Sequence, residues 1–303
     1  MVNTRFTALS VILCLITTLG FGQQISDGSF HYKVRKPLYK NNSGPAICVD
    51  DGHNNFHTLN GRYKPFGEVL QNDGYTVISS KSPVTNELLA KVKILVIANA
   101  LADTGEWKLP AKSAFNDKEI SILNHWVKTG GSLFLIADHM PFAGAAAALA
   151  KSFGFNFLNG IAFRKDGQPE IFSKKLQTLI PGTIVNGRDI SERIDSAEVF
   201  TGQAFLPPAN AKTITRLNDN YAILFPVRFG EISDTTARVS GFGFSNGASL
   251  EYYKGRVVVF GDAGMFTAQL AGDPPEKVGM NHAAAKQNPQ LLLNIIHWLD
   301  KKM

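Results

Sequence analysis

The sequence predicts an α/β protein with a flavodoxin-like, doubly wound and mostly parallel sheet that carries a β-rich insertion or sheet extension. Short, unbroken apolar runs alternate with segments of helical periodicity, which is typical of strands buried on both faces and joined by right-handed crossovers. Carboxylate or imidazole side chains follow three of these runs within two residues: Ala46–Val49, Leu133–Ala137 and Arg256–Phe260. The sequence therefore indicates where a site lies more clearly than which reaction it performs.

The first half of the chain predicts alternating helices and strands. Tyr63–Asn72 is apolar on one helical face and is followed by Gly74, a residue that commonly ends a helix in the left-handed conformation. Asn116 and Glu119 have the spacing of a capping box at the start of a longer helix. The other elements expected here are strands at Tyr75–Ile78, Ile94–Ala98 and Leu133–Ala137 and helices at Glu87–Val92 and Gly144–Ser152.

The character of the chain changes between about residues 160 and 246. Short β-like runs broken by Pro, Gly and Asn predict a β-rich insertion or sheet extension: Glu198–Thr201, Thr213–Leu217, Ala222–Val227 and Arg238–Phe244. A last core strand at Val257–Phe260 and a helix at Gln290–Leu299 then complete the domain. We expect one domain over residues 45–303, because about 280 residues suit a single large α/β domain or a domain with an insertion.

The amino terminus indicates export. Arg5 precedes an apolar stretch, Ala8–Leu19, and small residues stand before Gln23, so residues 1–22 have the features of a secretory signal peptide. The apolar stretch is too short for a membrane anchor, and Cys14 lacks the small preceding residue of a lipoprotein signal. We expect a secreted or periplasmic protein with an exposed lead-in over residues 23–44.

Cysteine content and charge limit the possible chemistry. Without the leader Cys48 is the single cysteine, so no intramolecular disulfide can form, and its place inside a strand predicts a buried small hydrophobe. The net charge of +6 falls to about +5 without Arg5 and includes no basic block. This disfavours a nucleic-acid partner and leaves a small molecule or glycan, including an anionic glycan, as the expected ligand.

Asp51, Asn54 and Asn55 accompany His53 and His57 in the loop after the first strand. Two imidazoles four residues apart could bind a transition metal together with a carboxylate, if the loop turned once like a helix. Alternatively, these groups hydrogen-bond the loop backbone and order the edge of a crevice.

A second group, Asp138 and His139, follows a strand and precedes a helix, where many α/β hydrolases carry their nucleophile. Such a pair can act as acid and base, as metal ligands, or as a carboxylate that orients the ring. In the simpler alternative Asp138 caps the helix and His139 faces solvent. Asp262 lies in a glycine-flanked turn after the last strand and could add a third carboxylate, and His282 could fold over the site on a flexible loop.

Because ligands of open parallel sheets bind at the carboxyl ends of the strands, we expect these clusters to meet. The expected catalytic residues are His53, His57, Asp138 and His139. The expected binding residues are Asp51, Asn54, Asn55, Asp262 and His282. A divalent metal, if one is bound, would use His53, His57 and His139. This set favours a hydrolase-like enzyme acting on a small or carbohydrate-derived substrate; the alternative is a non-catalytic carbohydrate- or peptide-binding domain.

The order Ile94–Ala100 and then Glu119–His139, with its Trp-Val-x-x-Gly-Gly-x-Leu segment before a strand, resembles the class I glutamine amidotransferase-like superfamily. More narrowly, it is similar to the ThuA-like and GIFT-related branches over roughly Pro45–Phe157 and Arg256–Asp262. The resemblance implies a flavodoxin-like fold, a site at the strand ends and, for the ThuA-like branch, an association with carbohydrate metabolism. Amidotransferases carry a cysteine at the strand-to-helix elbow, where this chain has an Asp-His pair, so glutaminase activity is not implied.

Overall fold

Five parallel strands form one side of a nine-stranded mixed sheet, with β3 at its edge. A computed structural model describes residues 24–168 and 170–303, so the predicted signal peptide lies outside the described residues. The parallel strands follow the order β3-β2-β4-β5-β15. Their bounds are β2 Ala46–Asp50, β3 Thr76–Ser80, β4 Ile94–Ala98, β5 Ser132–Ile136 and β15 Gly255–Phe260.

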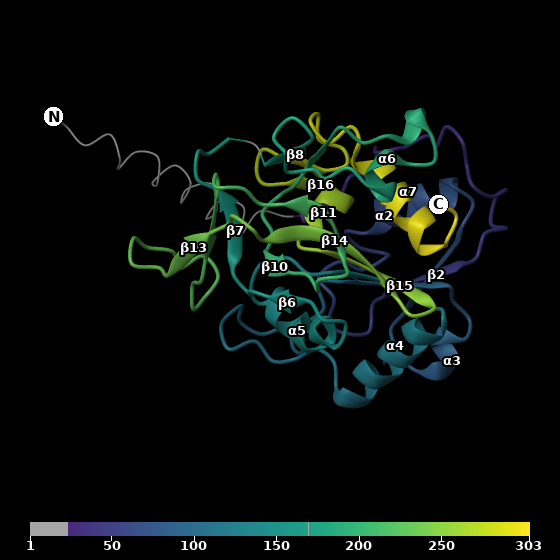
Figure 1. Ribbon diagram of the computed structural model, residues 1–303, viewed down its shortest axis with the longest axis horizontal. Coiled ribbons are helices and arrows are strands. Elements are labelled where there is room, and N and C mark those ends of the chain that lie inside the picture. Colours follow the sequence, from purple (N-terminus) through teal and green to yellow (C-terminus); the bar gives the residue numbers. More distant parts are fainter. Residues whose placement is uncertain (1–23, 169) are drawn as a thin grey trace.

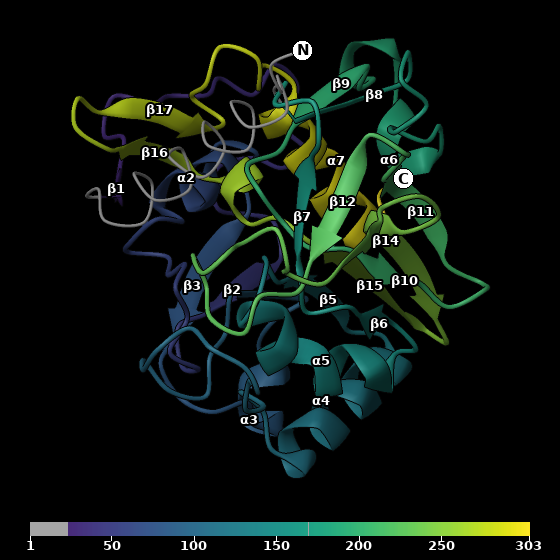
Figure 2. The same ribbon diagram turned by 90° about the vertical axis from the view of Figure 1, so that its left-hand side faces the viewer.

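Helices cover both faces of this sheet, as Figures 1 and 2 show. α3 (Asn86–Leu89), α4 (Asp117–Thr129) and α5 (Phe142–Ser152) lie on one face, and α2 (Lys64–Asn72) and α7 (Asn288–Leu299) lie on the other. Alternate residues of β5 point into two separate cores, Phe134 and Ile136 into one and Leu133 and Leu135 into the other. This two-sided burial explains the unbroken apolar runs, since neither face of a central strand meets water.

No helix within residues 24–168 and 170–303 combines the length and the apolar character that crossing a bilayer requires.

The local helix signals are confirmed. Gly74 has φ +92° just after α2, in the left-handed region that favours glycine. At the start of α4 the Asn116 side chain accepts a hydrogen bond from the Glu119 backbone N–H at 3.0 Å, and the Glu119 carboxylate accepts one from the Asn116 backbone N–H at 3.2 Å. α5 begins two residues earlier than expected, at Phe142, and α3 is only four residues long.

The β-rich region is partly a sheet extension and partly a separate layer. β14 (Ser245–Tyr252) runs antiparallel to β15 and carries the sheet on to β10 (Phe205–Leu206), β6 (Asn156–Phe157) and β11 (Lys212–Arg216). β7 (Ile161–Arg164), β12 (Tyr221–Leu224) and β13 (Arg238–Ser240) form a three-stranded sheet, with β7 and β12 in front of the central strands in Figure 2. The remaining elements are β8 Ile171–Ser173, β9 Ser196–Glu198, α6 Thr183–Asn186, η1 Ile190–Glu192, η2 Gly264–Phe266, β16 Ala268–Ala271 and β17 Glu276–Gly279.

Within the segment expected to be an exposed lead-in, exposed residues alternate with partly buried apolar residues that contact the core. β1 (Gln24–Ser26) pairs with β16, and the side chains of Phe30, Tyr32 and Tyr39 pack on the core that lies under α2 and α7. The physical reason is the series of apolar residues in this segment, which bury area that a solvent-exposed lead-in would leave in water. The side chains of residues 40–43 are exposed.

We expect Cys48→Ala to destabilise the protein without changing its chemistry. Cys48 is fully buried in β2, as predicted, and burial raises the pKa of its thiol to about 12, so the reactive thiolate is absent at neutral pH. The cavity left by the substitution should lower the free energy of unfolding by about 1–3 kcal/mol. Urea unfolding followed by circular dichroism measures this loss. A fully folded variant that lost ligand binding or turnover would contradict the purely structural role.

Candidate active site

The carboxyl ends of β2, β4, β5 and β15 meet around one polar cluster. Its centre is Asn99, which follows β4, together with Asp138, which follows β5. The Asn99 amide nitrogen donates to Asp138 Oδ2 at 2.6 Å, and the Asp138 backbone N–H donates to Asn99 Oδ1 at 2.8 Å. The backbone N–H of Ala263, after β15, donates to Asp138 Oδ1. These bonds tie three neighbouring strand ends together.

His57 joins this cluster as a neutral ring. Its Nδ1 lies 3.1 Å from the Asn99 amide nitrogen, and that nitrogen can only donate. The Nδ1 atom is therefore the acceptor, and the ring proton is on Nε2. Burial, with smaller contributions from the charges of Arg62 and His139, lowers the pKa of His57 to about 3. The buried imidazole thus offers an N–H donor, not a positive charge.

His139 has the opposite arrangement. Its Nδ1 lies 2.7 Å from the carbonyl oxygen of Met140, which can only accept, so the proton is on Nδ1 and the lone pair is on Nε2. The ring stacks on Phe229 with centroids 4.4 Å apart, and Trp107 and Phe142 lie within 6 Å. Burial lowers the pKa of His139 to about 4, which leaves the lone pair free at neutral pH.

Asp138 and Asp262 form a buried carboxyl pair. Burial raises the pKa of Asp138, and burial together with the nearby Asp138 raises that of Asp262. Ionising both carboxyl groups in a buried site would place two negative charges close together at a high cost in free energy, so the pair retains a proton. The oxygens of Asp262 accept from the backbone N–H groups of Phe200 at 2.6 Å and Met265 at 3.3 Å. Asp262 therefore organises the turn after β15.

The structure does not bring His53 into this cluster. Its Nδ1 lies 2.9 Å from Asp50 Oδ2, and its Nε2 lies 3.0 Å from Glu119 Oε1. The two carboxylates outweigh burial and raise the pKa of His53. Both ring nitrogens are occupied, so the expected unit of His53 with His57, Asp138 and His139 is corrected to one without His53. Both partner carboxylates accept from His53, so it is an imidazolium clamp between the loop after β2 and α4.

A metal centre of His53, His57 and His139 is likewise not assembled. Within residues 24–168 and 170–303 no group of three or more His, Cys, Asp or Glu side chains is arranged to hold a metal ion. His53 has no nitrogen left to ligate, and His57 directs its Nδ1 to an amide donor. The residues present therefore do not fit the metal hypothesis.

Three of the residues expected to bind ligand hydrogen-bond the protein instead. Their partners are backbone groups that order the loop after β2: Asp51 accepts from Leu59 at 3.1 Å, Asn54 donates to Ala102 at 3.1 Å, and Asn55 donates to Ala98 at 3.3 Å. His282 lies 2.5 Å from Glu198 and packs edge-on against Phe200, whose N–H holds Asp262. His282 thus supports the turn after β15 and is not a lid over His139.

Three residues of the site were missed from the sequence. Asn99 stands directly after a buried strand, so the strand-end rule that selected the other polar residues could have found it. Trp107 and Phe229 lie in loops that meet only in the fold, where the Phe229 N–H donates to the Trp107 carbonyl at 2.9 Å. No local pattern in the sequence indicates that contact.

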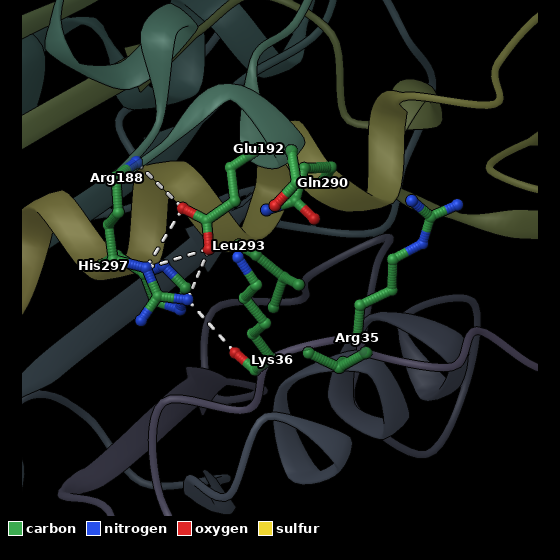
Figure 3. A pocket seen from close by; sticks show the side chains of 9 residues that line it. Arg35, Lys36, Arg188, Glu192, Gln290, Leu293 and His297 are labelled. Atoms are coloured by element: carbon green, nitrogen blue, oxygen red, sulfur yellow. Dashed lines mark hydrogen bonds and ion pairs between the residues drawn. The ribbon is translucent and has the colours of Figure 1, made fainter.

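Two hollows lie outside this cluster. One is a cavity between α7 and the chain near Lys36, where Glu192 is paired with Arg188 (Figure 3). Its volume is about 10 Å³. It has room for about one water molecule, which is too little for a substrate. The second hollow is open, measures about 620 Å³ and is lined by residues 225–237, the loop that also supplies Phe229.

Solved structures share this fold at low sequence identity. The domain described as mmIFT52 N-terminal domain is 14% identical over 84% of this chain and 96% of that one, with a TM-score of 0.59. A protein described as ThuA-like from Bacteroides uniformis ATCC 8492 is 12% identical over 90% of this chain and 95% of that one, with a TM-score of 0.47. The cytoplasmic protein STM1381 from Salmonella typhimurium LT2 is 14% identical over 84% of this chain and 98% of that one, with a TM-score of 0.48. The first of these similarities shows the fold alone.

No family model matches the sequence, and no curated protein matches it.

We expect His53→Ala to cost about 1.5–3 kcal/mol of stability at pH 6, because it removes the cationic partner of the buried Asp50 and Glu119, which keep their other hydrogen-bond donors. The folded-state pKa of His53 is raised, so its contribution is fully present below the unfolded value of about 6.5 and is lost as pH rises through the folded value. The loss of stability should therefore shrink toward pH 9. Urea unfolding across this pH range measures it.

The matched control is His125→Ala, at an exposed position of α4, which should change the free energy of unfolding by less than about 0.5 kcal/mol. Equal stability of the His53→Ala variant and the parent at pH 6 would rule out the clamp.

Proposed function

We propose that the protein is a hydrolase that cleaves an acyl bond, an ester or amide, in a small or carbohydrate-derived substrate. The observation that carries this proposal is that the two neutral imidazoles have opposite tautomers. His139 offers a lone pair at Nε2, and His57 offers a proton at Nε2. The two rings are close enough that a charge on His139 would disfavour one on His57.

In the proposed reaction His139 Nε2 accepts a proton from a water molecule as the water oxygen adds to the acyl carbon. The carbonyl electron pair moves onto the oxygen, and the His57 Nε2–H donates a hydrogen bond to the developing negative charge. When the tetrahedral intermediate collapses, the bond to the leaving group breaks and His139 returns the proton to that group. No covalent enzyme intermediate and no metal are needed.

Acyl chemistry is favoured over glycosidic cleavage by the state of the carboxyl groups. Glycoside hydrolysis uses two carboxyl groups that flank the scissile bond, one of which must reach the leaving oxygen. Asp138 accepts from Asn99 and Ala263, and Asp262 accepts from two backbone N–H groups. These carboxyl oxygens are engaged in holding the site.

An aromatic wall beside His139 fits a ring-shaped or acylated substrate. Trp107 and Phe229 lie edge-to-face with centroids 5.3 Å apart, and both rings are partly exposed. The apolar faces of sugar rings pack on such surfaces.

We also infer that the core belongs to the flavodoxin-like, amidotransferase-related folds, as the resemblance to the ThuA-like and GIFT-related branches implies. The strand order β3-β2-β4-β5-β15 corresponds to the order 2-1-3-4-5 of flavodoxin-like sheets, and this order supports the inference. The elbow after β5 carries Asp138 and His139 in place of a nucleophilic cysteine, so the proposed activity differs from that of a glutaminase.

The alternative function is a non-catalytic carbohydrate- or peptide-binding domain. The same aromatic wall favours it, since stacking surfaces also serve recognition without chemistry. A protein that binds a glycan or peptide but turns over no ester or amide would support this alternative.

Replacing the proposed base should abolish turnover. We expect His139→Ala to lower kcat/KM by about 10²-fold or more on the best substrate of a panel of acetylated sugars, simple esters and amides. A chelator should leave the rate unchanged. Protonation of His139 should lower the rate below about pH 4, because the lowered pKa keeps His139 neutral above that value.

The exposed His31 supplies the control, since His31→Ala should retain the parental rate. Parental turnover in folded His139→Ala protein would contradict the proposed role of His139.

We propose further that the protein is exported and works outside the cytoplasm. Amino-terminal sequencing of the exported form should find a first residue near Gln23, as the signal-peptide pattern predicts. Leu15→Arg, which breaks the apolar stretch, should block export. An exported chain that still contains Arg5 would refute the cleavage.

A further inference from the structure

We propose that Asn99 is a positioning residue that fixes His57 in its Nε2–H tautomer and so determines which ring atom faces the reacting group. This inference rests on the proposed function for its catalytic consequence. The tautomer itself is a property of the folded protein that can be measured without a substrate.

The amide of Asn99 has one possible orientation. The Asp138 backbone N–H can only donate, and it lies 2.8 Å from the Asn99 oxygen, so the other end of the amide is the nitrogen. The two hydrogens of that nitrogen point to Asp138 Oδ2 and His57 Nδ1. Reversing the amide would place its NH₂ group against a backbone donor and its oxygen against a carboxyl group.

The backbone holds this amide in place. Asn99 is fully buried, and its φ of +49° is in the left-handed region that asparagine tolerates better than most residues. Its N–H donates to the Ile136 carbonyl at 3.0 Å, and its carbonyl accepts from the Phe56 N–H at 3.0 Å. Asn99 is therefore fixed to β5 on one side and to the loop that carries His57 on the other.

Among the residues that the structure describes, the groups around His57 offer no competing donor or acceptor for Nδ1. The phenol of Tyr63 donates to the Ala263 carbonyl at 3.2 Å, although its ring lies only 5.0 Å from the imidazole. Arg62 donates to the Phe56 carbonyl and lies over the Phe56 ring. Together with Asp138 and His139, these are the titratable and charged groups that act on His57. Asn99 alone therefore selects the tautomer.

An aspartate at position 99 would reverse this selection. In a carboxylate–imidazole pair the acid accepts from Nδ1–H, which leaves the lone pair on Nε2 and produces a base. An asparagine amide donates to Nδ1 and makes Nε2 a donor. The difference between Asn and Asp at this one position thus decides whether His57 can stabilise an oxyanion.

Two-bond ¹H–¹⁵N correlation spectra of protein with ¹⁵N-labelled histidine rings test the inference at pH 7, with His57→Gln used to assign the signal. We expect the parent to show a neutral His57 with its proton on Nε2. Asn99→Asp should move the proton to Nδ1 or add a second one, and should lower kcat/KM by about 10²-fold or more with little change in KM. The control Asn124→Asp makes the same chemical change in α4, where Asn124 donates to Ser152, and should leave the His57 signal unchanged.

If Asn99→Asp fails to fold, the parent spectrum can still contradict the inference. A parental His57 that is protonated on Nδ1, or on both nitrogens, at pH 7 overturns the inference. So does an Asn99→Asp protein that folds and keeps the Nε2–H tautomer. A parent with the expected tautomer but no turnover on the substrate panel would refute the proposed function and leave the tautomer assignment standing.

Discussion

The hydrogen-bonded pair of Asn99 and Asp138 is the interaction on which the site depends. It joins the ends of β4 and β5 through two bonds of opposite direction, and the Ala263 N–H adds the end of β15. Parallel strands leave their terminal backbone groups unpaired at this edge, and buried polar groups are costly unless they find partners. The amide and the carboxyl group satisfy one another and several of these backbone groups, so the polar cluster is also what closes the end of the core.

The two imidazoles of the loop after β2 have neighbours that favour opposite protonation states. His53 lies between the carboxylates Asp50 and Glu119, which favour its charged form, whereas His57 faces an amide donor and the charge of Arg62, which favour its neutral form. The two rings stand in one loop, only four residues apart. From the sequence, His53 and His57 are equally good candidates for the site. Their hydrogen-bond partners differ, so His53 is a structural cation and His57 is a neutral donor.

The parallel core and the location of the site could be predicted from the sequence, because continuous apolar runs and the polar residues after them are local signals. Strand β14 could not be predicted, since its sequence Ser-Asn-Gly-Ala-Ser-Leu-Glu-Tyr has no β-branched residue. Its strand conformation depends on hydrogen bonding to its neighbours β15 and β11. His53 was misjudged for a related reason: its partner Glu119 is identified by the sequence as a capping residue, and the second role of that carboxylate depends on tertiary contacts.

The β-rich extension is part of the site and not an appendage. Phe229, in the loop between β12 and β13, stacks on His139, and the backbone of this loop is tied to the segment that carries Trp107. Phe142 at the start of α5 contacts both His139 and Trp107, so an aromatic layer from three separate parts of the chain surrounds the imidazole. Removing water from this ring lowers its pKa and keeps its lone pair available. The parallel sheet therefore supplies the positions of the polar groups, and the extension supplies the dry environment that determines their chemistry.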